Sequence, residues 1–363
     1  MNKPNICLSM IVKNEVHCIK RCLDSVKPYI KYFIICDTGS TDGTQQIIKD
    51  FMVDVPGELY EDEWKDFSYN RNLSLDRARA YAKNSKDIDY ILLIDADDYL
   101  VVEKSTAFNN LTKQIYTFNF HHGPISYYRI ELIHKSVEAK YVGVLHEYLS
   151  IPQNICPKIL SGVYIQFGAN GARSRDPNKY LNDAKIFEKA LINEPNNERY
   201  IFYCAQSYRD AQIYDKALEY YLERNRRGGW REEVYVSLLE AGKIIINTES
   251  NNVQKVENMF LAAHNSHQER AESLAYLSRY FRMLKEYHKA YFYSKIGMRT
   301  PKPREALFLE DACYDWWLMD ECSVAAFYIG RKDEAKVLVN ALLTKDIPAV
   351  EKDRIKNNLS FLK

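Results

Sequence analysis

Three carboxylates stand together where a strongly apolar stretch of the chain ends. Residues 90–94 read YILLI, and Asp95, Asp97 and Asp98 follow. An apolar run of this length predicts a buried parallel strand, and ligands in open α/β sheets bind beyond the carboxyl ends of the strands. On a continuing strand, Asp95 and Asp97 would point to the same side. Two such oxygen donors suit a Mg²⁺ or Mn²⁺ ion that also contacts substrate phosphates, although a simple turn or helix cap is the alternative.

A second polar loop, DTGSTDGT at residues 37–44, follows another apolar run. A loop of small residues at a strand end lets a nucleotide approach the backbone closely. Asp37 could then accept a hydrogen bond from a base or a ribose. Asp42 with Gln45 resembles a helix N-cap with a capping box, so we assign Asp42 to structure and Asp37 to ligand. The loop is not a P-loop, because GxxxxGK[ST] is absent.

An arginine lies near the start of the helix that begins at residue 67. Arg71 falls in the first turn of this helix, where a cation does not favour the helix dipole. This local conflict favours an external anionic partner such as a phosphate or a nucleotide. A plain surface arginine is the alternative.

The elements that must position these residues alternate between strands and helices. Apolar runs predict strands at residues 6–12 and 32–36, with a helix between them that stops before Pro28. A further helix follows residue 44, which gives the beginning of a βαβ sheet. Beyond the carboxylates, residues 116–121 and 126–134 alternate like paired strands, with Gly123-Pro124 as their turn.

Four motifs in this order resemble family-2 glycosyltransferases of the GT-A fold. They are CLSMIVKNE at residues 7–15, IICDTGSTDGT at 34–44, FSYNRN at 67–72 and YILLIDADD at 90–98. Each motif alone is weak, but their order and spacing together are specific. The resemblance implies an N-terminal α/β domain with a Rossmann-like mixed sheet.

The resemblance also implies a nucleotide-sugar donor, for which we expect a UDP-sugar, and a divalent metal ion, Mn²⁺ or Mg²⁺, on its diphosphate. By position, Glu15 and Asp37 would line the nucleoside pocket, and Arg71 would approach the nucleotide. Asp95 would face the ribose or the metal, and Asp97 would ligate the metal.

A second candidate for chemistry is the pair His146-Glu147. Glycosyl transfer with inversion, which the family resemblance implies, needs one carboxylate to take the proton of the acceptor. Many relatives use a Glu-Asp pair, which we do not find downstream of the carboxylate motif. Glu147 is therefore our candidate base and His146 a candidate metal ligand. A solvated Glu beside a hydrogen-bonded His is the alternative, and Asp98 is the rival base.

The second half of the chain changes to a helical period. Residues 168–178 are rich in Gly and polar residues, so we expect a glycosyltransferase domain at 1–170 and an all-α domain at 176–363. Arg173 and Arg175 could reach the donor site, but we favour a linker there.

The predicted all-α domain has the residue offsets of tetratricopeptide (TPR) repeats. Ala205 and Tyr208 fit the first helix of such a repeat, and Ala217 and Tyr221 fit the second. This half resembles the TPR-like extension of one glycosyltransferase subgroup. Trp316 and Trp317 could stack on a sugar, but we interpret them as core residues. Small residues late in each expected helical hairpin mark the repeats: Ala184, Ala217, Ala290 and Ala335.

Composition narrows the class of protein further. The chain has 363 residues and a formal net charge of +1, which gives no support for bulk binding to nucleic acid. The eight cysteines form no CxxC pair, so we expect reduced core residues and no zinc site. We find neither the apolar core of a signal peptide nor an apolar run of about 20 residues that could span a membrane. A cytoplasmic protein is expected.

We therefore expect a metal-dependent glycosyltransferase, hexosyltransferase-like, that acts on a protein, peptide or glycan. The TPR-like repeats would present the acceptor, bind a protein partner or self-associate. An inactive GT-A fold that serves as a TPR scaffold is the alternative, but it predicts decay of the intact Asp95 and Asp97. A sugar nucleotidyltransferase should carry a Gly-rich basic loop where this chain has residues 12–15, VKNE, so it ranks last.

Overall fold

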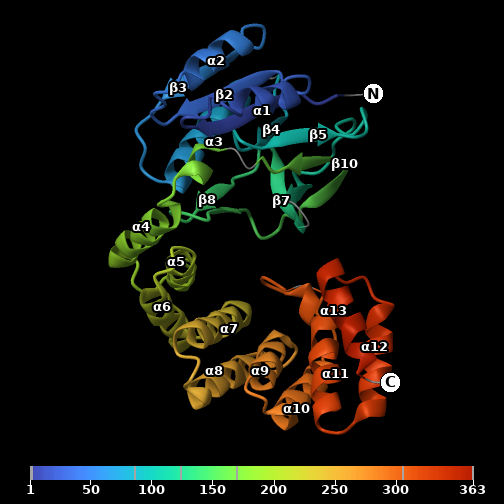
Figure 1. Cartoon of the computed structure of the whole chain (residues 1–363). Helices are drawn as coiled ribbons and strands as arrows, with labels where there is room; N and C mark the ends of the chain where they lie inside the picture. Colours follow the sequence, from blue (N-terminus) through green and yellow to red (C-terminus); the bar gives the residue numbers. More distant parts are fainter. Residues whose placement is uncertain (1–2, 86, 123–124, 169–170, 305, 362–363) are drawn as a thin grey trace. The chain divides into compact units, whose positions relative to one another are not determined.

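The structure is a computed structural model that describes residues 3–85, 87–122, 125–168, 171–304 and 306–361 (Figure 1). Contacts divide the chain into two compact units, Met1–Ile186 and Phe187–Lys363. The division falls inside helix α4 (Lys179–Asn193). The domain boundaries expected at residues 170 and 176 stay a prediction, and the two units are described separately below.

The N-terminal unit is built on a mixed sheet with the order β3-β2-β1-β4-β7-β6-β10-β5. The first four strands in this order are parallel, and β7 joins antiparallel to β4. A separate antiparallel pair is formed by β8 and β9. The strands are β1 (Ile6–Val12), β2 (Tyr32–Asp37), β3 (Gly57–Glu61), β4 (Tyr90–Leu93), β5 (Tyr99–Val102), β6 (Ile115–His122), β7 (Ile125–His134), β8 (Lys140–Val142), β9 (Tyr148–Ser150) and β10 (Lys158–Gln166).

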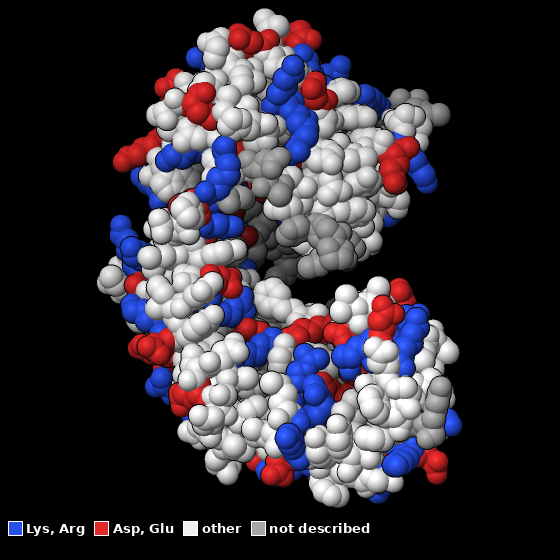
Figure 2. All heavy atoms as spheres, viewed as in Figure 1, with Lys and Arg blue, Asp and Glu red and all other residues white. Residues whose placement is uncertain are grey.

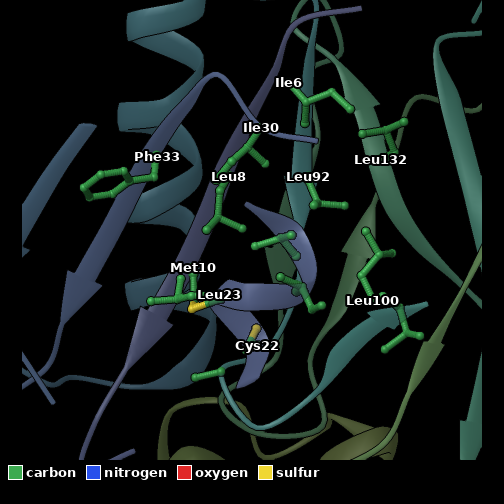
Figure 3. Packing of buried hydrophobic residues seen from close by; sticks show 14 of the residues in the cluster. Ile6, Leu8, Met10, Cys22, Leu23, Ile30, Phe33, Leu92, Leu100 and Leu132 are labelled. Atoms are coloured by element: carbon green, nitrogen blue, oxygen red, sulfur yellow. The ribbon is translucent and has the colours of Figure 1, made fainter. Parts of the chain in front are cut away.

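Helices cover both faces of this sheet because the central strands are apolar on both sides. Alternate residues of β1, such as Leu8 and Met10, pack with α1 (Ile19–Val26) and α2 (Thr44–Phe51) in one core cluster (Figure 3). Cys7, from the other face of β1, packs with α3 (Phe67–Asn84) in a second cluster. The expected α/β class, with a mixed sheet, is confirmed.

The predicted elements agree with the structure near the start of the chain and differ in detail near the carboxylates. The strand expected through Ile94 ends at Leu93, and residues 95–98 form a turn in which Asp98 N donates to Asp95 O at 3.2 Å. The expectation of a continuing strand was therefore wrong. The capping box at Asp42 was also wrong, because Gly43 is the N-cap of α2 and its φ of 96° lies in the left-handed region. The predicted Gly123-Pro124 turn lies outside the described residues.

The C-terminal unit is a series of helical hairpins with TPR-like packing. The alanines that mark the repeats are fully buried, as are Ala205 and Tyr221. Small residues at these places let the two helices of a hairpin approach closely. The helices are α5 (Glu198–Asp210), α6 (Tyr214–Arg227), α7 (Arg231–Thr248), α8 (Val253–Ser266), α9 (Glu272–Met283), α10 (Tyr287–Gly297), the π-helical turn η2 (Cys313–Trp317), α11 (Leu318–Tyr328), α12 (Lys332–Leu343) and α13 (Ala349–Ser360).

Buried side chains in both units agree with most of the compositional expectations. Trp317 is a core residue whose indole N–H donates to Glu321 at 3.0 Å. The cysteines are free thiols, and all are buried except Cys156, which is exposed. No helix within the described residues is long and apolar enough to cross a membrane. Figure 2 shows acidic and basic side chains of both signs on the visible face of each unit.

Candidate active site

A cavity of about 820 Å³ opens at the carboxyl ends of the parallel strands in the N-terminal unit. Its walls come from residues 11–15 after β1, Thr38 after β2, residues 95–98 after β4, and residues 171–186. This volume is within the usual range for small-molecule sites, about 300–1,000 Å³. Of the residues expected to do chemistry, Glu15, Arg71 and the three aspartates line this one cavity.

The loop after β2 is fixed from within by Asp37. This side chain is fully buried, and its Oδ1 accepts hydrogen bonds from the backbone N–H groups of Gly39 at 2.9 Å and Ser40 at 2.7 Å. Asp37 does not line the cavity, whereas its neighbour Thr38 does. Asp37 Oδ2 is buried with no hydrogen-bond partner among the described residues, so one acceptor remains unused. Its role toward a nucleoside stays a prediction.

Asp42 ties this loop to the segment after β1. Its Oδ1 accepts from the backbone N–H of Thr44 at 3.0 Å, and its Oδ2 accepts from the backbone N–H of Val16 at 3.1 Å. Burial raises its pKa, but these hydrogen bonds outweigh burial and lower the pKa of Asp42. The contacts of Asp42 are therefore structural, although not those of a helix N-cap.

Arg71 holds the first aspartate of the motif. Helix α3 begins at its N-cap Asp66, which accepts from Tyr69 N at 2.7 Å, and this places Arg71 one turn into the helix. Arg71 Nη2 lies 2.5 Å from Asp95 Oδ1, and Arg71 Nε lies 2.6 Å from Glu147 Oε1. Arg71 therefore has partners within the protein as well as a place on the cavity wall.

A second arginine, Arg129 on β7, contacts the same carboxylate from another strand. Its guanidinium lies 3.3 Å from Asp95 Oδ2 and 3.4 Å from Asp98 Oδ2, and it also pairs with Glu131. Burial raises the pKa of Asp95, but Arg71 and Arg129 outweigh burial and hold it below its ordinary value. Asp95 is therefore a fixed anion between two cations.

Sequence reasoning missed Arg129 and Glu131. Both lie on one face of β7, two residues apart, and Glu131 is only 1% exposed. Burial raises the pKa of Glu131 to about 7, against the effect of Arg129. An Arg and a Glu at this spacing within an otherwise apolar strand are the signal that could have identified the pair.

Asp97 has a different environment from Asp95. It lines the cavity, and within the described residues it forms no ion pair with a cationic side chain. Burial, followed by repulsion from Asp95 and Glu15, raises the pKa of Asp97 to about 6. The backbone of Gly171 comes so close that a Cβ there would lie 2.4 Å from Asp97 Oδ2.

The other two carboxylates of the cavity are held by backbone groups. Glu15 accepts from Ala172 N at 3.2 Å, and burial raises its pKa. Asp98 Oδ1 accepts from Gly168 N at 3.3 Å. Burial and repulsion from Asp95 raise the pKa of Asp98, and Arg129 opposes this rise.

The pair His146-Glu147 is separated by the fold. Glu147 is linked to the cavity through Arg71 but does not line it. His146 is exposed, has a left-handed φ of 50°, and also does not line the cavity. Within the described ranges, no three His, Cys, Asp or Glu side chains are grouped as a metal site.

The cavity nevertheless fits a divalent cation at Asp97. Mg²⁺ and similar ions bind one or two protein carboxylates and take their other ligands from water and substrate phosphates. Asp97 offers a carboxylate crowded by anions, and Asp95 retains lone pairs beyond those that the two guanidinium groups use.

Residues that the sequence assigned to a linker form the far wall of the cavity. Arg173 lies in the 3-10 helix η1 (Ala172–Arg175), where it pairs with Asp183 and covers the ring of Phe67 at 4.8 Å. Arg173, Lys179 and Asp183 all line the cavity. The preference for a pure linker role of Arg173 was therefore wrong.

Comparisons with known proteins agree with this placement. Residues 7–106 match the family model described as Glycosyl transferase family 2. The chain is 26% identical over 233 residues to the SPbeta prophage-derived glycosyltransferase SunS of Bacillus subtilis (strain 168), which covers 60% of this chain and 52% of that protein. The chain thus spans about half the length of this relative.

Other similarities concern the helical unit. A TPR repeat-containing protein of Synechococcus elongatus is 34% identical over 110 residues, 30% of this chain and 24% of that protein. The crystal structure of MamA has a TM-score of 0.38 at 14% identity and covers 50% of this chain and 92% of that one. That of TTC0263, a thermophilic TPR protein in Thermus thermophilus, has a TM-score of 0.34 at 17% identity and covers 51% and 91%.

Proposed function

We propose that this chain, whose N-terminal domain belongs to glycosyltransferase family 2, transfers a sugar from a UDP-sugar donor to a protein, peptide or glycan acceptor. The observation that carries the proposal is the contrast between two neighbouring carboxylates in one cavity. Asp95 is neutralised by two arginines, while Asp97 faces the cavity without an ion pair among the described residues. A site of this kind attracts a cation and, with it, a diphosphate.

The donor would occupy the cavity along the carboxyl edge of the sheet. Its nucleoside would lie beside Glu15 and Thr38, after β1 and β2, and its diphosphate beside the turn after β4. Asp97, with Asp95 behind it, would hold a Mn²⁺ or Mg²⁺ ion, and such an ion supplies positive charge to the leaving diphosphate. Arg71 and Arg129 keep Asp95 ionised and fixed in position.

The reaction also needs a base for the acceptor. A bond forms between the acceptor atom and the anomeric carbon as the bond from that carbon to the phosphate oxygen breaks, with inversion, and the acceptor proton passes to a carboxylate. Asp98 is the better placed candidate, because it lines the cavity and its raised pKa suits a group that takes up a proton near neutral pH. Glu147 would instead position Arg71.

Calorimetric titration tests the donor site directly. UDP is titrated into the wild-type chain, into Asp97→Asn and into Asp24→Asn, each with and without Mn²⁺. Asp24 is an exposed residue of α1 and serves as the matched control. We expect binding that depends on Mn²⁺ in the wild type and in Asp24→Asn, and loss of that dependence in Asp97→Asn.

The opposite result would favour a different function. If neither UDP nor GDP binds the wild-type chain, with or without metal, the donor site is refuted. The chain would then be a scaffold whose helical unit binds partners. With a functional donor site, we propose that the TPR-like unit presents the acceptor, which is tested by comparing transfer to candidate acceptors before and after substitutions on its exposed surface.

A further inference from the structure

One part of the cavity is aromatic rather than charged, and the donor site described above does not use it. Phe120 on β6, Tyr127 on β7 and Phe167 directly after β10 line this part. β7, β6 and β10 are neighbours in the sheet, so the fold brings the three rings together. The ring centroids of Phe120 and Tyr127 are 5.1 Å apart, and those of Phe120 and Phe167 are 6.2 Å apart.

The three rings differ in how far solvent or a ligand can reach them. Phe120 is 3% exposed, whereas Tyr127 is 45% exposed. On the antiparallel strands these two residues lie directly opposite each other, so Phe120 supports the ring of Tyr127 from behind. The guanidinium of Arg129 lies 4.4 Å from the centroid of the Phe120 ring and fixes this support to the carboxylate turn. Tyr127 therefore presents a rigid ring with an accessible surface.

The order of the strands decides what reaches this ring. Across the sheet, the cavity runs from the ends of β2 and β1, past the turn after β4, to β7 and β6. A donor with its nucleoside at the first position and its diphosphate at the second would place its sugar at the third. Resting on the proposed function, we propose that the Tyr127 ring binds the apolar C–H face of the donor hexopyranose.

The chemistry of the ring suits such a ligand. A pyranose ring has faces of C–H groups and a rim of hydroxyls, and a flat aromatic ring covers the C–H face without needing a specific hydrogen bond. The contact contributes affinity to the sugar and none to free UDP. The ring of Tyr127, and not its hydroxyl, should carry the effect.

The chain offers a matched control one residue away. Tyr128 is 55% exposed, on the same strand, but alternate residues of a strand point to opposite faces, and Tyr128 does not line the cavity. Tyr127→Ala, Tyr127→Phe and Tyr128→Ala therefore separate the effect of the ring, of the hydroxyl and of an exposed tyrosine on β7 in general.

The test compares UDP with sugar nucleotides in the presence of Mn²⁺. UDP, UDP-glucose, UDP-galactose and UDP-N-acetylglucosamine are titrated into the wild-type chain, and the tightest sugar nucleotide is then titrated into the three variants. For Tyr127→Ala we expect its affinity to fall roughly three- to tenfold, with UDP affinity unchanged to within about twofold. Tyr127→Phe and Tyr128→Ala should match the wild type for both ligands.

Several results would overturn the assignment. Equal losses for UDP and for the sugar nucleotide in Tyr127→Ala, or no loss for either, would remove the ring from sugar binding. The same loss in Tyr128→Ala would trace the effect to the strand as a whole. In each of these cases UDP still binds the wild type, so the donor site itself stands. Failure of the wild-type chain to bind UDP or GDP would refute the proposed function and this assignment together.

Discussion

Arg71 and Asp95 form an ion pair, with 2.5 Å between Arg71 Nη2 and Asp95 Oδ1, and the same guanidinium holds Glu147 on its other side at 2.6 Å. This relationship connects helix α3, the turn after β4 and the segment before β9. It gives Glu147 a positioning contact and leaves Asp98 as the carboxylate that faces the cavity. The two candidate bases can therefore be separated by experiment.

Asp98→Asn should remove the base. We expect kcat for release of UDP from a UDP-sugar in the presence of acceptor to fall about 10²- to 10⁴-fold, the usual contribution of a general base, with donor affinity nearly unchanged. Glu147→Gln should reduce kcat by no more than about tenfold, because the amide oxygen can still accept from Arg71. Steady-state kinetics of both variants provide the measurement. A larger loss in Glu147→Gln than in Asp98→Asn would reverse the assignment.

Arg129→Met should destabilise the N-terminal unit. Without its partner, Glu131 would be a buried carboxyl that has to become protonated. Because the guanidinium is 33% exposed, we expect a cost of about 1–3 kcal/mol, less than for a fully buried pair. Hydrogen exchange of amides in β6 and β7, measured by mass spectrometry, reports this local free energy. In Arg129→Met/Glu131→Gln most of the loss should be recovered, and absence of recovery would show that Arg129 stabilises the fold in another way.

Gly171→Ala should disturb the cation site by sterics alone. The φ and ψ of Gly171, −60° and 151°, are ordinary for alanine, but the new Cβ would lie 2.4 Å from Asp97 Oδ2. We expect the Mn²⁺-dependent part of UDP binding to fall at least about tenfold, as for loss of a well-placed ligand, with little change in Tm. Calorimetry and a thermal melt provide the two readings. Unchanged metal dependence would show that Asp97 is displaced without consequence.

Acid should weaken the C-terminal unit through Glu272. Burial raises the pKa of Glu272, but hydrogen bonding and charge from Arg270, at 2.6 Å, outweigh burial and lower it. A carboxyl with a lowered folded-state pKa stabilises the protein above its unfolded value, about 4.3, and this contribution is lost as the pH falls through the folded pKa. In urea unfolding followed by circular dichroism, the difference between wild type and Glu272→Gln should therefore shrink below about pH 4.3. A difference that is constant from pH 7 to pH 3 would contradict this.

The sequence alone determined the elements whose signals are local. Strand β1 and helix α1 have the bounds that their apolar runs and Pro28 indicate, because these patterns need no distant partner to be recognised. The same holds for the buried alanines of the helical hairpins. Strand β3 was missed, because its sequence GELYE is acidic and only partly buried, and pairing with β2 makes it a strand.

Only the tertiary structure decided how the site residues meet. Arg71 and Glu147 are 76 residues apart, and Arg129 and Asp95 are 34 apart, so no periodicity relates them. Chain folding pairs Asp95 with two arginines, leaves Asp97 facing the cavity, and turns His146 outward. Residue types and motif order thus determined which chemistry the chain can carry. Burial and long-range ion pairs, which depend on the whole sheet, decided which carboxylate can do which part of it.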